Sequence, residues 1–497
     1  MDAAYEGLRR RLAEVTDLRT IAELLFWDQT VMMPPTGGPV RAAQLSTVEQ
    51  VAHERAVDSE LGRLLDELAP RGESLPYDSD EASLIRVARR DYERARRVPP
   101  ELSAEITRVA SEAMEAWVRA RADSDFGSFR PWLERTLELK RRYVDCFEPE
   151  DDPYDVVLDD YEPGMRTAEV RAIFDRLKEV LPRLVDAAAT EEEDAFLRGP
   201  FPEERQHALS LELLRAWGFS ERSWRLDRTV HPFCSSSGSH DIRLTSRYAE
   251  GDLTSLFTAM HEMGHGLYEA GVDPALERTP LGSGCSSALH ESQSRLWENV
   301  VGRSLPFWRW FYPRVQAAFP ERLDGVDVER FHRAVNRVRR SFIRVDADEA
   351  TYGLHIVLRF ELEQELLEGR LAVAELPEAW NARFREYLGI DVPEDRLGVL
   401  QDVHWSGGSF GYFPTYQLGN VISVQIWERV REALPDVEEQ IERGEFGELG
   451  AWLREHVYRH GRKLTPRELL ERVIGGPIDP EPYIRYLESK FGSPVAA

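Results

Sequence analysis

The chain has 497 residues, 42% of them hydrophobic, and a formal net charge of −26. This hydrophobic content supports a sizeable core and excludes global disorder. The negative charge argues against nucleic acid as a partner, because binding to nucleic acid requires a basic face. The three cysteines, Cys146, Cys234 and Cys285, form no C-x-x-C pair. They therefore suggest neither a disulfide framework nor a cysteine zinc site, and they fit a reducing compartment.

The N-terminal segment lacks the apolar core of a signal peptide. No apolar run reaches the roughly 18 residues that a membrane span requires. These two features predict a soluble cytoplasmic protein with no membrane partner.

Helical periodicity runs through most of the chain. Breakers rich in proline and glycine, such as those at 33–38 and 199–202, separate several of the helical segments. The helices predicted in the first half cover residues 3–27, 40–69, 79–97, 101–121, 128–146, 167–195 and 203–217.

The pattern changes between residues 224 and 245, where two short strands are predicted at 224–233 and 241–245 around a turn at 235–240. An edge strand at this position can hold an extended peptide by main-chain hydrogen bonds. A plain connecting hairpin is the alternative. After it, helices are predicted over residues 253–270, 286–302, 306–317, 327–367 with a break, 373–387, 416–433, 436–444, 447–459, 465–473 and 480–490.

No internal repeat or low-complexity linker marks a domain boundary. We therefore expect residues 1–497 to form a single catalytic domain, mostly α-helical, with two lobes about a cleft.

The stretch His261-Glu-Met-Gly-His265 gives the first indication of a metal site. Two histidines four positions apart lie on one face of a helix, so both imidazoles can reach one metal ion, usually Zn²⁺. Glu262 can act as a general base on a water molecule at the metal. The helix is also apolar enough to be buried, and a buried group of this kind needs partners or a metal.

A catalytic zinc site requires a third protein ligand. Tyr268 and Gly271 occupy the positions where the metzincin form has glycine and histidine, so that form is excluded. A glutamate on a following helix is the alternative. Glu291 is the best candidate, and Glu298 and Glu269 are its weaker rivals.

Further motifs stand along the chain. They are His231-Pro-Phe233, Asp241-Ile-Arg-Leu-Thr245, the His261–His265 helix, His290-Glu-Ser-Gln293, Ile343-Arg-Val-Asp-Ala-Asp348, Gly398-Val-Leu-Gln-Asp-Val-His-Trp405 and Leu25-Phe-Trp-Asp-Gln29 with Met33-Pro34. With these motifs the chain resembles the carboxypeptidase Taq family of metallocarboxypeptidases over nearly its full length. Gly353 stands where this family is expected to have proline, outside the chemistry.

The resemblance implies a large helical fold like those of neurolysin and angiotensin-converting enzyme, with a deep substrate groove and usually a homodimer. It also implies that His261, His265 and Glu291 bind zinc. The implied activity is removal of C-terminal residues from peptides, with broad specificity. Cobalt is a plausible substitute for zinc at a site of nitrogen and oxygen ligands.

The oxyanion that forms during peptide hydrolysis requires hydrogen-bond donors besides the metal. By analogy with the wider group of folds, Tyr416 is favoured for this role, then Tyr412, with His404 beside the same glycine-rich loop. Buried tyrosines in an aromatic loop more often serve packing alone. His231 is expected to hydrogen-bond the substrate main chain.

An exopeptidase of this kind must bind a free α-carboxylate, which favours a fixed arginine. Arg344, in the Ile-Arg motif, is the first candidate and Arg243 the second. The expected partners are therefore peptides with a free C-terminal carboxylate. An endo-oligopeptidase of the same fold and a non-catalytic peptide-binding protein remain alternative hypotheses.

Overall fold

The computed structural model describes residues 3–149, 151–190 and 195–492. The chain divides into two compact units, each assembled from three separate stretches. Unit 1 comprises residues 1–96, 193–335 and 426–477, and unit 2 comprises residues 97–192, 336–425 and 478–497. The single catalytic domain over residues 1–497 stays a prediction.

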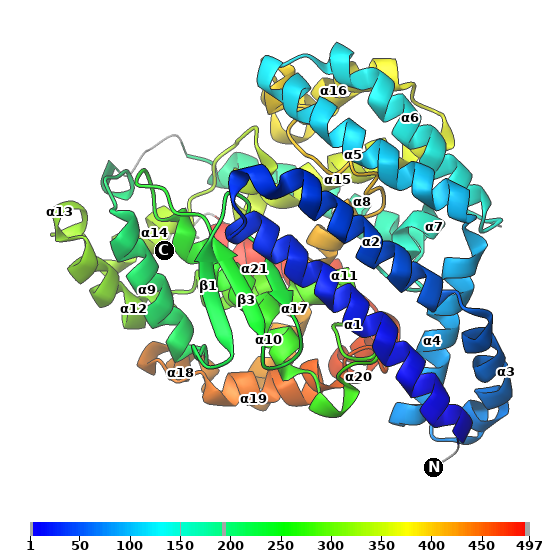
Figure 1. Cartoon of the computed structure of the whole chain (residues 1–497). Helices are drawn as coiled ribbons and strands as arrows, with labels where there is room; N and C mark the ends of the chain where they lie inside the picture. The colour runs from blue at the N-terminus through cyan, green and yellow to red at the C-terminus, as the bar shows by residue number, and fades with distance from the viewer. Residues whose placement is uncertain (1–2, 150, 191–194, 493–497) are drawn as a thin grey trace. The chain divides into compact units, whose positions relative to one another are not determined.

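Unit 1 contains the β-sheet and the helices packed on it (Figure 1). Its elements are α1 (Ala3–Val31), η1 (Pro35–Gly37), α2 (Gly38–Ala56), α3 (Ser59–Ser74), α4 (Asp80–Arg97), η2 (Ala195–Leu197), α9 (Glu203–Ala216), β1 (Trp224–Arg228), β2 (Cys234–Ser236), β3 (Ile242–Ser246), α10 (Thr254–Gly271), η3 (Pro274–Leu276), α11 (Ser287–Arg295), the π-helical turn η4 (Leu296–Val301), α12 (Leu305–Ala318), α13 (Pro320–Leu323), α14 (Val328–Val335), the end of α17, α18 (Val437–Arg443), α19 (Gly447–His456), η8 (Tyr458–His460) and α20 (Pro466–Ile474).

In the part that the structure describes, unit 2 consists of helices, loops and an isolated bridge between Ala189 and Val338. Its elements are α5 (Pro100–Asp123), α6 (Phe126–Asp145), α7 (Tyr154–Asp159), α8 (Thr167–Ala188), η5 (Arg344–Asp346), α15 (Glu349–Glu368), η6 (Val373–Glu375), α16 (Leu376–Leu388), η7 (Asp395–Leu397), most of α17 (Phe413–Ala433) and α21 (Pro480–Phe491).

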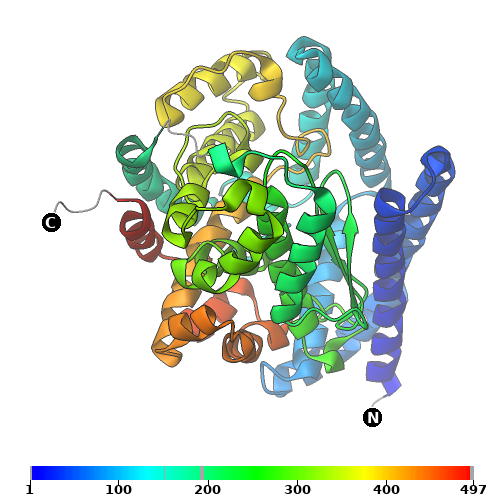
Figure 2. The same ribbon diagram turned by 90° about the vertical axis from the view of Figure 1, so that its left-hand side faces the viewer.

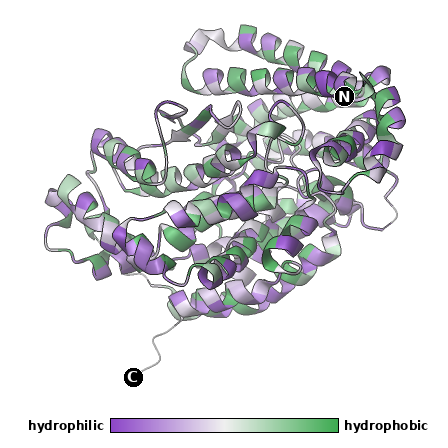
Figure 3. Cartoon of the chain, turned by 90° about the horizontal axis from the view of Figure 1, so that it is seen from below, coloured by the Kyte–Doolittle hydropathy of each residue, from purple (hydrophilic) through white to green (hydrophobic). Residues whose placement is uncertain are grey.

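The mostly helical fold with a small sheet beside the histidine-bearing helix is thus confirmed. Green hydrophobic and purple hydrophilic residues alternate along the helices in Figure 3, as expected when each helix buries one side. No helix within the described ranges is both long and apolar enough to cross a membrane.

Some helix boundaries differ from the sequence prediction. The helix expected over 40–69 is two helices, because Asp58 caps the start of α3 by accepting a hydrogen bond from the Glu60 N–H. The short helix α7 was missed, since a six-residue segment gives too little periodicity. The break expected within 327–367 is confirmed and lies between α14 and α15.

The predicted hairpin between 224–233 and 241–245 is wrong. Strand β1 pairs in parallel with β3, and the antiparallel partner of β3 is β2, which forms from Cys234 and the first two residues of the predicted turn. Pro232 interrupts the first segment because proline provides no N–H to a strand ladder. The chain therefore reverses after β1 and returns as the edge strand β2.

Helix α10 lies between the sheet and α11 because of two glycines. A Cβ on Gly266 would lie 2.5 Å from Cζ3 of Trp224 in β1. A Cβ on Gly264 would lie 2.6 Å from the carbonyl oxygen of Gln293 in α11. The side chain of Met263, between these glycines, is fully buried. Residues without side chains thus allow α10 to approach both neighbours closely.

The N-terminal helices α1 and α2 also belong to unit 1, and α1 contacts strand β2. Helices α1 and α2 run side by side, and both views place α1 beside the sheet (Figures 1 and 2). The lower part of α1 packs with α3 and α4 in a leucine-rich core that includes Leu8, Leu12, Leu65 and Leu84. Farther along α1, Phe26 contacts Phe233, with ring centroids 5.5 Å apart.

The close packing of α10 predicts the effect of Gly264→Ala. The new methyl group would collide with backbone atoms of α11, which cannot rotate away as a side chain can. We expect a lower Tm, corresponding to a loss of about 1–3 kcal/mol of stability. The control is Gly450→Ala in α19, where the added Cβ would have no described atom within 4 Å apart from its chain neighbours and the nearby backbone of its own helix. A Tm for Gly264→Ala equal to that of this control would contradict the packing argument.

Candidate metal centre

Three side chains converge between α10 and α11. His261 and His265 lie one turn apart on α10, and Glu291 lies in α11, which begins where the Ser286 side chain accepts a hydrogen bond from the Leu289 N–H. The candidate ligand atoms of the three residues all lie within 4.8 Å of one another. The Nε2 atoms of His261 and His265 lie 3.6 and 3.4 Å from Oε2 of Glu291.

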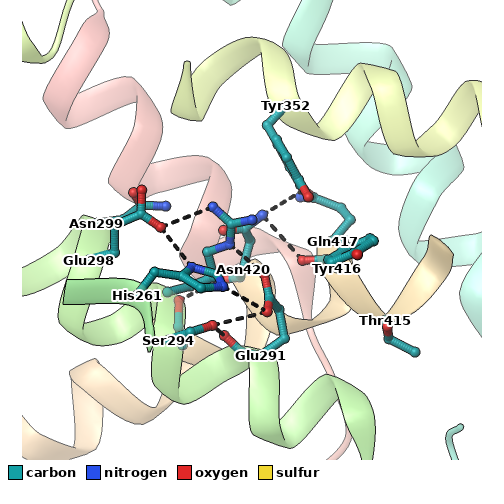
Figure 4. A network of polar contacts seen from close by, with 12 residues as sticks. His261, Glu291, Ser294, Glu298, Asn299, Tyr352, Thr415, Tyr416, Gln417 and Asn420 are labelled. Carbon is teal, nitrogen blue, oxygen red and sulfur yellow. Dashed lines mark hydrogen bonds and ion pairs between the residues drawn. The ribbon is translucent and has the colours of Figure 1, made fainter. Parts of the chain in front are cut away.

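The other ring nitrogen of each histidine is already engaged. Nδ1 of His261 lies 2.9 Å from Oε2 of Glu298, as drawn in Figure 4. Nδ1 of His265 lies 2.6 Å from Nδ1 of His290. These contacts leave both Nε2 atoms facing Glu291, the orientation in which two neutral imidazoles can share one metal ion.

Arg295 compensates the buried carboxylates of α11 and the π-helical turn. Its Nε donates to Oε1 of Glu291 at 2.7 Å, and its Nη1 donates to Oε2 of Glu298 at 3.2 Å. Burial alone would raise the pKa of both glutamates. Arg295 and the neighbouring histidines outweigh burial, hold the pKa of Glu291 far below its usual value and lower that of Glu298 to about 2. Both groups therefore carry negative charge.

The charges around the histidines fit a divalent cation. Among the largely buried side chains that the structure describes here, four carboxylates face two guanidinium groups. With neutral imidazoles and all four carboxylates ionised, the group has an excess of two negative charges, which a divalent ion would balance. The carboxylates are Glu262, Glu269, Glu291 and Glu298, and the guanidinium groups are Arg295 and Arg303.

Glu262 is buried beside the first histidine, with 6% of its surface exposed. Burial is the main reason that its pKa rises to about 7, and the charge of Glu291 adds to the rise while His261 opposes it. A carboxyl group with a pKa near neutrality can both accept and release a proton at physiological pH.

The two rival ligand candidates have other partners. Glu298 accepts from His261 on the side opposite the convergent Nε2 atom, and Glu269 contacts His290. Neither belongs to the group of three whose ligand atoms converge. The structure therefore favours Glu291 over both as the third ligand.

Two further predicted residues of unit 1 lie in the sheet or in the segment that connects its strands. His231 is exposed, in the segment between β1 and β2. Arg243 in β3 donates to both carboxylate oxygens of Asp241 at 2.9 Å, and its guanidinium lies 4.3 Å from the ring centroid of Trp27. Their roles in substrate binding stay predictions.

Unit 2 brings the other four predicted residues together. His404 Nε2 lies 3.2 Å from the hydroxyl of Tyr416, and the His404 ring stacks on Tyr412 with centroids 5.7 Å apart. The guanidinium of Arg344 lies 4.8 Å from the Tyr416 ring centroid. Burial is the largest cause of the lowering of the His404 pKa to about 4, so its imidazole is neutral at pH 7.

The sequence reasoning assigned no role to Asp402, which organises this cluster. Its Oδ1 accepts from Nε of Arg344 at 3.0 Å, and its Oδ2 accepts from Nε of Arg359 at 2.7 Å. Asp402 lies two positions before His404 in the motif Gly398–Trp405, and this proximity is the sequence feature that could have indicated its role. Arg295 was also missed, although its spacing of four from Glu291 and three from Glu298 is typical of helical ion pairs.

Glu363 of α15 fixes the glycine-rich loop before α17 through hydrogen bonds. This fully buried carboxyl accepts from the Tyr154 hydroxyl at 2.6 Å, the Trp405 Nε1 at 2.8 Å and the Gly411 N–H at 3.1 Å. Three donors on one carboxyl hold both ends of the 405–411 segment. The positions of His404 and Tyr412 on either side of this segment follow from that anchor.

Comparison with known proteins decides the family. Residues 7–491 match the sequence model of carboxypeptidase Taq (M32) metallopeptidases. The chain belongs to this family. The suspected resemblance is therefore confirmed, and the family consists of metallocarboxypeptidases, enzymes that hydrolyse peptides at the C-terminal residue.

Relatives match this chain over nearly its full length. It is 41% identical to thermostable carboxypeptidase 1 of Thermus thermophilus over 99% of both chains, and 35% identical to carboxypeptidase 1 of Bacillus subtilis over 97% of both. The crystal structure of the M32 carboxypeptidase from Deinococcus radiodurans is 42% identical, with a TM-score of 0.95 and 99% of each chain covered. The fold and the family thus agree over nearly the whole chain.

The convergent ligand atoms predict that metal stabilises the protein. A ligand that binds only the folded state at 100 times its Kd adds about 2.7 kcal/mol of stability. Adding Zn²⁺ to chelator-treated protein should therefore raise the Tm. His265→Ala should abolish this rise, whereas Glu262→Gln, which removes no proposed ligand, should retain it. A wild-type Tm that does not respond to Zn²⁺ would contradict the metal centre.

Proposed function

We propose that this protein is a zinc-dependent metallocarboxypeptidase that releases C-terminal amino acids from peptides with broad specificity. The convergence of His261, His265 and Glu291 on one point, in a member of a metallocarboxypeptidase family, carries the proposal. Two imidazole nitrogens and one carboxylate oxygen match the ligand set of catalytic zinc sites, which keep a further position open. Cobalt suits the same donors and can substitute.

A divalent ion held by these three residues would acidify water and polarise the scissile carbonyl. Glu262 serves as the proton carrier. It takes the proton from the attacking water and then delivers it to the nitrogen of the leaving amino acid. Its place next to His261 and its burial support this assignment.

The other predicted residues are also proposed to contact the substrate. Tyr416, then Tyr412, donates to the developing oxyanion, and the neutral His404 fixes the Tyr416 hydroxyl. Arg344, rather than Arg243, pairs with the free α-carboxylate of the substrate. The cluster of Arg344 and Arg359 about the single carboxylate of Asp402 has a surplus positive charge, which supports binding of a carboxylate there.

His231 is proposed to hydrogen-bond the substrate main chain, and its exposed position on the segment before β2 leaves it accessible for this. A homodimer and a cytoplasmic location stay predictions drawn from the resemblance and the composition.

Paired peptides test the proposed activity. We expect an unblocked peptide to lose residues one at a time from its C-terminus, because recognition requires the free carboxylate, while the same peptide with an amidated C-terminus stays intact. Mass spectrometry of the products, with and without chelator, measures both. Rapid internal cleavage of the amidated peptide would overturn the proposal in favour of the alternative, an endo-oligopeptidase.

Glu262→Gln provides the control within this experiment. The amide has nearly the same shape but cannot accept a proton, so turnover should fall by at least 10²-fold, within the range of about 10²–10⁴ for general acid–base catalysis. Bound metal, measured by elemental analysis, should be unchanged.

Arg344→Lys tests the carboxylate contact. Lysine keeps the charge but loses the planar fork, so we expect kcat/KM for free-carboxylate peptides to fall about 10- to 100-fold, equivalent to about 1.5–3 kcal/mol for a hydrogen bond to a charged group. The matched control is Arg385→Lys, an exposed arginine that pairs with Asp391. An unchanged kcat/KM for Arg344→Lys would move the role to another residue.

A further inference from the structure

A chain of polar contacts extends behind His265, away from the candidate metal position. Nδ1 of His265 lies 2.6 Å from Nδ1 of His290, and Nε2 of His290 lies 2.8 Å from Oε1 of Glu269. All three side chains are at least three-quarters buried. The contacts therefore form a short buried array, His265–His290–Glu269, that begins at a proposed ligand and ends on a carboxylate.

The chemistry of these groups leaves one arrangement of protons. If Nε2 of His265 binds metal through its lone pair, the hydrogen of the neutral ring must be on Nδ1. That N–H can only donate to Nδ1 of His290, which must therefore carry a lone pair. The hydrogen of His290 is then on Nε2 and donates to the carboxylate of Glu269.

We propose that His290 and Glu269 are positioning residues that hold His265 in its metal-binding tautomer. The inference rests on the proposed metal site. The two ligands are supported differently, because His261 contacts a carboxylate, Glu298, directly. A neutral imidazole accepts a hydrogen bond less strongly than a carboxylate, so His290 requires the charge of Glu269 behind it to match that support.

The surroundings hold the His290 ring in place. Its centroid lies 5.2 Å from that of Tyr268 and 4.7 Å from that of His265. A Cβ added at Gly284 would lie 2.8 Å from Cδ2 of His290. A glycine at position 284 thus leaves the space that the imidazole occupies.

Glu269 connects the array to two other segments. Its Oε1 also accepts from the Gly284 N–H at 3.1 Å, and its Oε2 accepts from the Ser236 hydroxyl at 3.2 Å. Ser236 is the last residue of β2, the edge strand. One carboxylate therefore fixes the second histidine, the loop before α11 and the end of the edge strand together.

The test compares metal affinity among full-length variants, with Co²⁺ as the probe and a chelator as competitor. His290→Leu removes the acceptor, and we expect the Kd for Co²⁺ to rise roughly 10- to 100-fold, the usual effect of losing such a partner. His290→Asn places an amide oxygen near the former Nδ1, and Glu269→Gln removes only the charge. Both should lose less affinity than His290→Leu. The exposed His240→Leu is the control and should bind as the wild type does.

The outcomes separate this inference from the proposed function. A Kd for His290→Leu equal to that of the wild type, or a loss in His290→Asn as large as in His290→Leu, would overturn the positioning role. Should His290→Leu fail to fold by circular dichroism, an unchanged Kd in Glu269→Gln would overturn it instead. Wild-type protein that binds Co²⁺ with the expected ranking of variants but hydrolyses no peptide would refute the proposed function and leave this inference standing.

Discussion

The close approach of α10 to its two neighbours is the constraint on which the candidate metal centre depends. Gly266 allows the helix to lie against β1 and β3, and Gly264 allows it to lie against the backbone of α11. Only at this spacing can a glutamate on α11 reach between two histidine rings on α10. The hydrophobic residues on the same helix contribute the burial that maintains this packing. Packing at backbone distance thus sets the geometry of the chemistry, because neither helix can shift without a collision or a void.

Burial of this group creates an electrostatic requirement. When all four largely buried carboxylates are ionised they repel one another, and the two arginines balance only half of their charge. The remaining charge is what a divalent ion would balance. The same environment gives the carboxyl groups different pKa values. Glu291 and Glu298, next to Arg295, are held ionised, whereas Glu262, with burial dominating, has a pKa near neutrality. One helix pair therefore provides both fixed negative charge and a group that can exchange a proton.

Unit 2 contains a comparable buried ionic cluster, but in this cluster the positive charges outnumber the negative ones. Arg344 and Arg359 share the single carboxylate of Asp402, and Glu363 holds the glycine-rich loop through three donors. In the same unit, a hydrogen bond between His404 and Tyr416 and ring contacts of both residues with Tyr412 restrict these three side chains. Preorganised groups of this kind are effective because they need no rearrangement when charge develops on a substrate. Both units therefore fix their functional candidates through buried ionic contacts.

The sequence by itself determined the helical class and predicted His261 and His265 as a metal-binding pair, because helical periodicity and a spacing of four are local properties. With the family motifs it also predicted Glu291 as the third ligand. It did not determine the strand pairing, since residues 234–236 resemble a turn until β3 supplies their hydrogen-bond partners. Only the tertiary structure revealed that Nδ1 of His261 contacts Glu298 and Nδ1 of His265 contacts His290, that Arg295 pairs with Glu291 and that Asp402 joins two arginines. The roles of these residues depend on which side chains folding places within hydrogen-bond distance and on how deeply they are buried. Neither quantity is encoded in local spacing.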